Sequence, residues 1–225
     1  MNRETAGRIL PENDNYEKLR RYWAAEVAKM DFPALAKRFD LRYDGAALYI
    51  RYFAREYRVA RQSGEITALD APEDRLNYDT VMAIWHLFYY SKPEARVRGE
   101  FVPFRSVRRL APFEPNYQQT ILKPFARAFS GKPELLRLAC EKLGGRPIRQ
   151  GDVGYQIDVF SCMPLCVTFW DADEEFEAQA NILFDADITD FLHEETVVLV
   201  ASDLTAQLFR AAGLTDRAVS FGNDH

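Results

Sequence analysis

The stretch that decides the fold is "NYDTVMAIWHLFYY", Asn77 to Tyr90, in a chain of 225 residues. It is nearly all apolar after an Asn or Asp that is suited to cap a helix N-terminus. Such a pattern predicts a helix that is buried on most sides and forms the central core element. His86 lies inside it, and a lone histidine in that setting is expected to be a hydrogen-bonded core residue rather than a ligand.

Towards the N-terminus, the sequence predicts a helix followed by a β-meander. In "YEKLRRYWAAEVAKM", Tyr16 to Met30, apolar residues recur at three- and four-residue spacings, which is typical of a helix with one apolar face. The segment Asp40 to Asp70 has short aromatic and β-branched runs with turn signals at Asp44-Gly45 and Ser63-Gly64. We expect three or four antiparallel strands there.

Towards the C-terminus, the patterns predict a second small sheet closed by a helix. "GEFVPFRSV", residues 99–107, reads as a strand or extended segment, and two helices are expected near residues 115–130 and 132–145. Three strand candidates follow, "YQIDVF", "PLCVTFW" and "ANILFD", and a final helix from about Glu194 to Ala212. The fold class is therefore α+β, an antiparallel β-meander and a second small sheet packed with about five or six helices.

No repeat or flexible linker divides the chain, so we predict a single α+β domain over residues 1–225. Its parts are an N-terminal helix, a β-meander over residues 41–70, a mainly helical middle over residues 77–149, and an acidic strand–hairpin–helix part over residues 150–225.

Charge is distributed unevenly along the chain. Residues 1–95 hold 15 acids and 15 bases, residues 96–149 hold four acids and 12 bases, and residues 150–225 hold fifteen acids and two bases. Because long-range fields depend on where charges lie, this asymmetry matters more than the net charge of −5. Either the basic middle and the acidic end face each other in the fold, or each offers a single-sign surface to a partner.

The composition predicts a cytoplasmic protein with no membrane segment. The N-terminal residues are charged throughout, and no stretch approaches the roughly 18 uncharged apolar residues of a membrane helix. Three cysteines, Cys140, Cys162 and Cys166, are too few for a disulfide framework, which fits a reducing compartment. We expect them to be buried small hydrophobic residues.

The sequence lacks the common catalytic and nucleotide-binding motifs, in which the geometry of the site fixes the residue spacing. It contains no Walker loop, GxGxxG, HExxH or GxSxG. The chain has only three histidines, His86, His193 and His225. Few residues are therefore available for a nucleophilic triad or a histidine-rich metal site. No catalytic residue is assigned, and no cofactor is predicted beyond a candidate divalent cation.

That cation would bind the stretch "FWDADEEFEAQANILFD", Phe169 to Asp185, which holds six carboxylates. A standard calcium loop starting at Asp171 fails, because Phe176 replaces the required glycine and Ile182 the bidentate glutamate. A non-standard Mg²⁺ or Ca²⁺ site remains if the strands bring both hairpin ends together. Its ligands would be Asp171, Asp173, Glu175 and Asp185, with Asp187 as a further candidate, and the protein would then be a metal-dependent hydrolytic enzyme.

The structural alternative for these acids is a solvated turn over Asp171 to Glu175, with Asp190, Glu194 and Glu195 capping the final helix. Trp170 and Phe176, which bracket the turn, would then be ordinary core anchors.

The first functional hypothesis is a binding or accessory protein. Its cleft would lie between the basic middle, represented by Arg105, Arg108 and Arg109, and aromatic residues such as Trp170, and it would hold a small anionic ligand or a protein partner. The segment "RVRGEFVPFRSVRR", residues 96–109, interleaves arginines with aromatics as single-strand nucleic-acid binders do. Nucleic acid is the less favoured partner because the acidic last third would repel phosphates.

The run from Gly151 to Phe209 resembles the C-terminal half of an uncharacterised prokaryotic domain-of-unknown-function family of anaerobic bacteria and archaea. The match is carried by Trp170, Asp173, Glu175, Phe176, Ile182, Leu183, Phe184 and Asp185, and "REYRV" and "GEFVPFRSV" resemble the family's earlier strands. Some members are joined to a four-cysteine iron–sulfur module like those of corrinoid proteins in one-carbon metabolism, and this chain lacks that module. The resemblance therefore implies a metabolic setting but no activity and no cluster.

Overall fold

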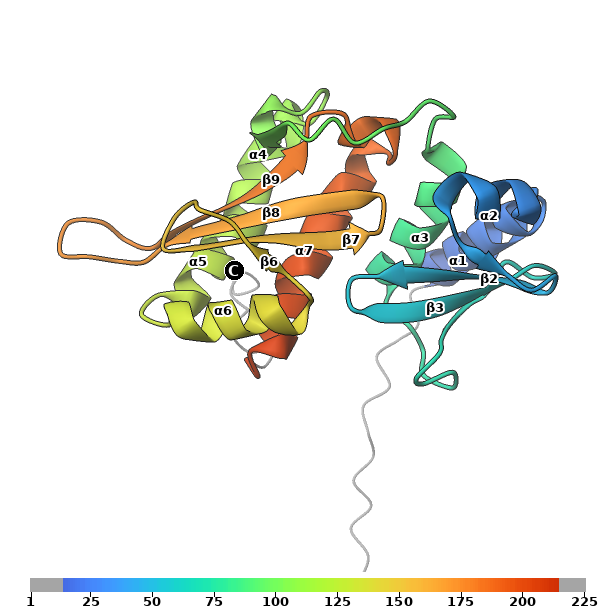
Figure 1. Cartoon of the computed structure of the whole chain (residues 1–225), viewed down its shortest axis with the longest axis horizontal. Helices are drawn as coiled ribbons and strands as arrows, with labels where there is room; N and C mark the ends of the chain where they lie inside the picture. Colours follow the sequence, from blue (N-terminus) through green and yellow to red (C-terminus); the bar gives the residue numbers. More distant parts are fainter. Residues whose placement is uncertain (1–13, 215–225) are drawn as a thin grey trace, which may run out of the picture.

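Two antiparallel sheets organise the protein, as a computed structural model that describes residues 14–214 shows. One sheet has four strands and the other has five, and helices pack against both. The α+β class predicted from the sequence is confirmed. In Figure 1 the elements form an N-terminal lobe, coloured blue to green, and a C-terminal lobe, coloured green to red.

The N-terminal lobe contains the predicted β-meander, with strands in the order β1-β2-β3-β4. Its turns at Gly45 and Gly64 have φ angles of +89° and +69°, which glycine adopts more readily than other residues. The short helix α2 begins where the Asp31 side chain accepts a hydrogen bond from the Ala34 N–H. The elements are α1 (Asp14–Ala28), α2 (Phe32–Phe39), β1 (Arg42–Tyr43), β2 (Ala47–Tyr52), β3 (Arg55–Ala60), β4 (Ile66–Ala68) and α3 (Tyr78–Tyr90).

In the C-terminal lobe the strand order is β5-β9-β8-β7-β6, so the predicted strand near residue 101 lies at the edge beside β9. Figure 1 shows α4, α5 and α7 on one face of this sheet, and the loop between β8 and β9 extends away from the body. The principal elements are β5 (Phe101–Pro103), α4 (Glu114–Tyr117), a π-helical turn (Gln118–Leu122), α5 (Lys123–Phe129), α6 (Pro133–Lys142), β6 (Arg146–Pro147), β7 (Val153–Phe160), β8 (Met163–Trp170), β9 (Gln179–Asp185) and α7 (Glu194–Ala211). The C-terminal lobe also contains three 3₁₀ turns, at Phe104–Ser106, Ala111–Phe113 and Ile188–Asp190.

Helix α3 lies in the core between α1 and α7, as its apolar sequence predicts. The Asn77 side chain caps it by accepting a hydrogen bond from the Thr80 N–H at 2.7 Å. His86 is buried, and its Nδ1 lies 2.5 Å from the Thr196 hydroxyl of α7. The prediction of a hydrogen-bonded core histidine is confirmed.

The two lobes are packed against each other. The Phe53 N–H donates to the Val159 carbonyl at 2.8 Å, and the rings of Tyr52 and Phe160 are 5.0 Å apart. The buried apolar side chains of both lobes form one continuous cluster. This continuity supports the predicted single domain, which stays a prediction. Among residues 14–214, no helix is both long enough and apolar enough to span a bilayer.

Candidate functional site

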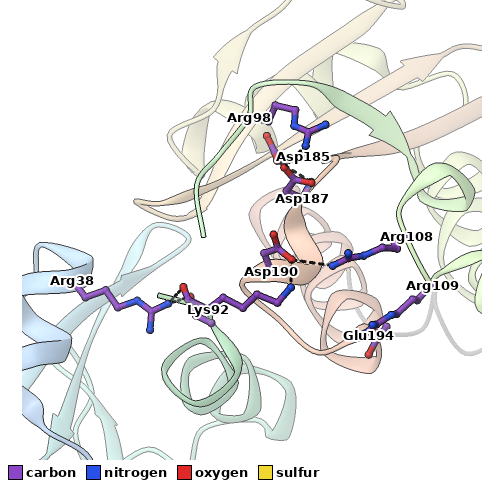
Figure 2. A network of polar contacts seen from close by, with 10 residues as sticks. Arg38, Lys92, Arg98, Arg108, Arg109, Asp185, Asp187, Asp190 and Glu194 are labelled. Carbon is purple, nitrogen blue, oxygen red and sulfur yellow. Dashed lines mark hydrogen bonds and ion pairs between the residues drawn. The ribbon is translucent and has the colours of Figure 1, made fainter. Parts of the chain in front are cut away.

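The basic middle and the acidic end of the chain face each other, which is the first of the two arrangements left open by the sequence. Figure 2 shows acidic residues around the end of β9 and the start of α7, and three of them, Asp187, Asp190 and Glu194, lie opposite basic side chains. The ion pairs are Lys92–Asp190 (2.6 Å), Arg98–Asp187 (2.8 Å), Arg108–Asp190 (3.0 Å) and Arg109–Glu194 (3.0 Å). Part of the charge asymmetry is therefore compensated within the fold.

Asp190 does not cap the N-terminus of α7, although the sequence predicts that it does. The helix is capped by His193, whose Nδ1 accepts a hydrogen bond from the Glu195 N–H at 3.4 Å. Asp190 lies before it in a 3₁₀ turn, and Lys92 and Arg108 lower the pKa of its carboxyl group. Asp190 therefore joins segments that are far apart in sequence instead of capping the helix.

Asp185 is the most buried of the acids in the Phe169–Asp185 stretch, with 2% of its surface exposed. One carboxylate oxygen accepts a hydrogen bond from the Gly99 N–H at 2.7 Å, and the other accepts from the Asp187 N–H at 3.1 Å. It thereby fastens the segment that leads into β5 to the end of β9 (Figure 2). Its observed role is structural.

The four carboxylates proposed as metal ligands do not converge. In the β8–β9 register Trp170 pairs with Gln179 and Leu165 with Phe184, so Asp185 lies at the opposite end of β9 from the hairpin loop. At about 3.3 Å per residue, six residues separate it from the loop by about 20 Å. The expectation that the strands bring both hairpin ends together is wrong. Within residues 14–214, no group of three or more His, Cys, Asp or Glu side chains is arranged to hold a metal ion.

The loop itself is a solvated turn, as the structural alternative predicts. Asp173 accepts hydrogen bonds from the Glu175 and Phe176 N–H groups, both at 2.8 Å, and these bonds lower the pKa of its carboxyl group. Asp171 accepts a hydrogen bond from the Gly131 N–H at 2.7 Å. Trp170 and Phe176 are 41% and 62% exposed, so the suggestion that both are core anchors is wrong.

The residues predicted to hold an anionic ligand are also dispersed. Arg108 and Arg109 are paired with carboxylates near α7, and Arg105 is exposed on a 3₁₀ turn. Trp170 lies at the far end of β8, in a hollow whose other lining residues include Asp152, Asp171 and Asp173. A hollow lined by carboxylates repels anions, so these four residues do not form one anion site.

A different group of basic residues surrounds a groove between the lobes. The groove has a volume of about 590 Å³, in the size range of small-molecule sites. It is bounded by the end of α2, by the segment of residues 91–100 that joins α3 to β5 (the connecting segment), and by residues from the C-terminal lobe. Its lining residues are Ala34, Lys37, Arg38, Phe39, Ser91, Pro93, Ala95, Arg96, Val97, Cys162 and Phe191.

The charge of this basic groove is of one sign, because its lining contains Lys37, Arg38 and Arg96 and no acid. Arg38 donates hydrogen bonds to two neutral acceptors. One is the Ser91 hydroxyl, at 2.8 Å, and the other is the Lys92 carbonyl, toward which Arg38 points in Figure 2. Burial and the positive charge of Arg96 lower the pKa of Arg38, whereas Glu94 raises it to a smaller extent. In the described part of the chain, none of the three cations has a carboxylate oxygen within ion-pair distance.

Sequence reasoning missed this groove because its residues come from distant parts of the chain. Arg96 begins the basic segment that the charge count identified, but Lys37 and Arg38 lie in the last turn of α2, where basic residues are common. The groove beside α1 has a mixed lining that combines Arg20 and Arg21 with Glu17, Glu65 and Asp74, and the hollow at Trp170 is lined by acids. The unmatched positive charge distinguishes the basic groove.

A separate polar cluster is buried where α3 meets α7. Asp203 is 1% exposed, and its carboxylate accepts a hydrogen bond from the Thr80 hydroxyl at 3.1 Å and pairs with Arg210 at 3.4 Å. Burial and the nearby Asp203 carboxylate raise the pKa of Asp79 to about 6. Two carboxylates therefore lie close together at the contact between the lobes.

Asp79→Asn is expected to stabilise the protein at pH 7.5 by about 1 kcal/mol, after allowance for solvent screening and for the lost helix-dipole interaction. Because the pKa of Asp79 is higher in the folded state, its ionised form costs stability above pH 6, and the cost disappears as the pH falls towards 4. Urea unfolding of both proteins from pH 8 to pH 4 should show the difference shrink. As a control, Glu134→Gln in the first turn of α6 should give no gain; an equal gain would contradict the burial argument.

Comparison with known protein families identifies the family of this chain. A family model described as a domain of unknown function, DUF3786, matches residues 31–207. The match runs from the cap of α2 to within α7, so it covers both sheets and all the residues that line the basic groove. No curated protein and no solved structure matches the chain.

Proposed function

The chain belongs to the DUF3786 family, whose function is unknown, and on that premise we propose that it is a binding or accessory protein that holds a small anionic ligand in the basic groove. The observation that carries this proposal is the convergence of Lys37, Arg38 and Arg96 on one groove without a lining carboxylate. The positive charge of Arg96 disfavours the charged form of Arg38, and a bound anion would relieve that repulsion.

The side chains suit this role chemically. Arginine presents a planar fork of N–H donors that matches carboxylate and phosphate groups, and lysine adds a point charge. The groove lies beside the paired acids of the C-terminal lobe, but Lys92 and Arg108 already neutralise Asp190, the acid next to the lining residue Phe191. The anaerobic or one-carbon setting implied by the family resemblance stays an expectation.

We expect full-length protein to bind at least one of phosphate, pyrophosphate and citrate with a Kd below about 1 mM, equivalent to about −4 kcal/mol, in calorimetry at low salt. The double variant Lys37→Gln/Arg96→Gln should weaken that binding at least tenfold, because both changes remove rim charges without breaking an ion pair of the fold.

The control is Arg105→Gln/Arg149→Gln, which removes the same number of exposed positive charges outside the groove. It should bind the anion as the unmodified protein does. If neither these anions nor any phosphate or carboxylate with an apolar body binds, the proposal is wrong. It is also wrong if both double variants lose affinity equally, since that result would show only nonspecific attraction.

A further inference from the structure

The basic groove has an apolar floor beneath its charged rim. Phe39 and Phe191 are only 7% and 4% exposed, and Ala95 is also buried, whereas Lys37, Arg38 and Arg96 are exposed. Pro93 and Val97 of the connecting segment add apolar surface at the side, with Val97 39% exposed. The groove therefore presents cations to solvent and hydrocarbon to its interior.

The remaining polar groups of the floor are uncharged. The Ser91 hydroxyl is uncharged and accepts a hydrogen bond from Arg38. Burial raises the pKa of the Cys162 thiol to about 11, so it is protonated and neutral at pH 7. A small hydrophilic anion would pair with the cations of the rim but leave the apolar side chains of the floor in contact with water.

Resting on the proposed function, we infer that the ligand is an amphipathic anion, a carboxylate or phosphate group joined to an apolar body. The anionic group binds Lys37, Arg38 and Arg96 at the rim, and the apolar body covers Phe39, Phe191 and Val97. Both halves contribute because removal of apolar surface from water is favourable independently of the charge contact. Small-molecule sites commonly combine a mainly apolar lining with a few orienting polar groups.

The test compares anions of equal charge and different apolar size on the full-length protein. Calorimetric titration with methyl phosphate, phenyl phosphate and 1-naphthyl phosphate should show Kd fall at least tenfold across the series, and acetate, benzoate and 2-naphthoate should show the same order. The two series distinguish a preference for phosphate from a preference for carboxylate.

Val97→Ser should weaken 1-naphthyl phosphate severalfold and leave methyl phosphate unchanged, because Val97 lines the groove. Its control is Leu138→Ser, which changes a residue of α6 that is 54% exposed and does not line the groove. If methyl and naphthyl phosphate bind equally and Lys37→Gln/Arg96→Gln weakens both, the amphipathic inference fails and the proposed function stands. If no anion binds at all, the proposed function fails with it.

Discussion

Gly64→Ala is expected to lower the free energy of unfolding by about 2 to 4 kcal/mol, the largest effect of a single methyl group that the structure predicts. A Cβ atom on Gly64 would lie 1.9 Å from the Ala24 carbonyl oxygen of α1, which is far inside van der Waals contact. The backbone there also has a φ of +69°. The turn and helix α1 must separate to accept the methyl group, and that movement disturbs the Trp85 Nε1–H bond to the Gly64 carbonyl, now 2.8 Å long.

Gly45→Ala is the matched control, because Gly45 has a similar φ of +89° but no atom within 4 Å of its added Cβ. This substitution should cost only about 1 kcal/mol, the penalty of the left-handed conformation. Urea unfolding of both variants measures the difference through the transition midpoint at constant slope. Equal losses for the two glycines would show that the contact between the β3–β4 turn and α1 is not tight.

Asp185→Ala is expected to destabilise the protein by about 2 to 4 kcal/mol, because it removes two charge-assisted hydrogen bonds made by a buried carboxylate. The carboxylate accepts hydrogen bonds from Gly99 and Asp187 while only 2% exposed. Its loss should also loosen the connecting segment at Gly99, although the Arg98–Asp187 ion pair still links that segment to the end of β9. Hydrogen exchange at the Gly99 amide should therefore accelerate in the variant under native conditions.

Asp173→Ala supplies a control of the same residue type with the same number of backbone hydrogen bonds. Asp173 accepts from Glu175 and Phe176 at 2.8 Å, but it lies in the exposed hairpin loop, where water replaces the lost acceptor. Its substitution should cost less than about 1 kcal/mol. If both aspartates cost the same, burial would not be the reason that Asp185 matters.

These paired variants also separate the two roles of the acidic stretch that the sequence could not distinguish. Asp173 organises a turn locally, through residues two and three positions ahead of it, which is a pattern readable from sequence. Asp185 acts on Gly99, 86 residues away, through pairing of β5 with β9. Whether a carboxylate points to solvent or to a distant amide depends on strand register, which local composition does not encode.

In the candidate site, too, the sequence predicts some features and the fold decides others. The sequence identified the basic segment that contains Arg96, but it assigned the anion to Arg105, Arg108 and Arg109 because they are adjacent in the chain. Arg108 and Arg109 are instead neutralised by Asp190 and Glu194, and Arg96 joins Lys37 and Arg38 across the groove. Counting charges along the chain shows how much charge is present, whereas the fold decides which charges remain unpaired.

The sequence by itself determined the elements: the capped, apolar helix from Tyr78 to Tyr90, the meander with glycine turns, the hairpin, and the final helix beginning at Glu194. Each depends on neighbours within a few residues, so propensity, capping and periodicity suffice. Only the tertiary structure decided that the basic middle faces the acidic end and that a cationic rim with an apolar floor forms between the lobes. Those features join residues up to about 150 positions apart, and their proximity follows from the packing of whole elements against one core rather than from any local preference.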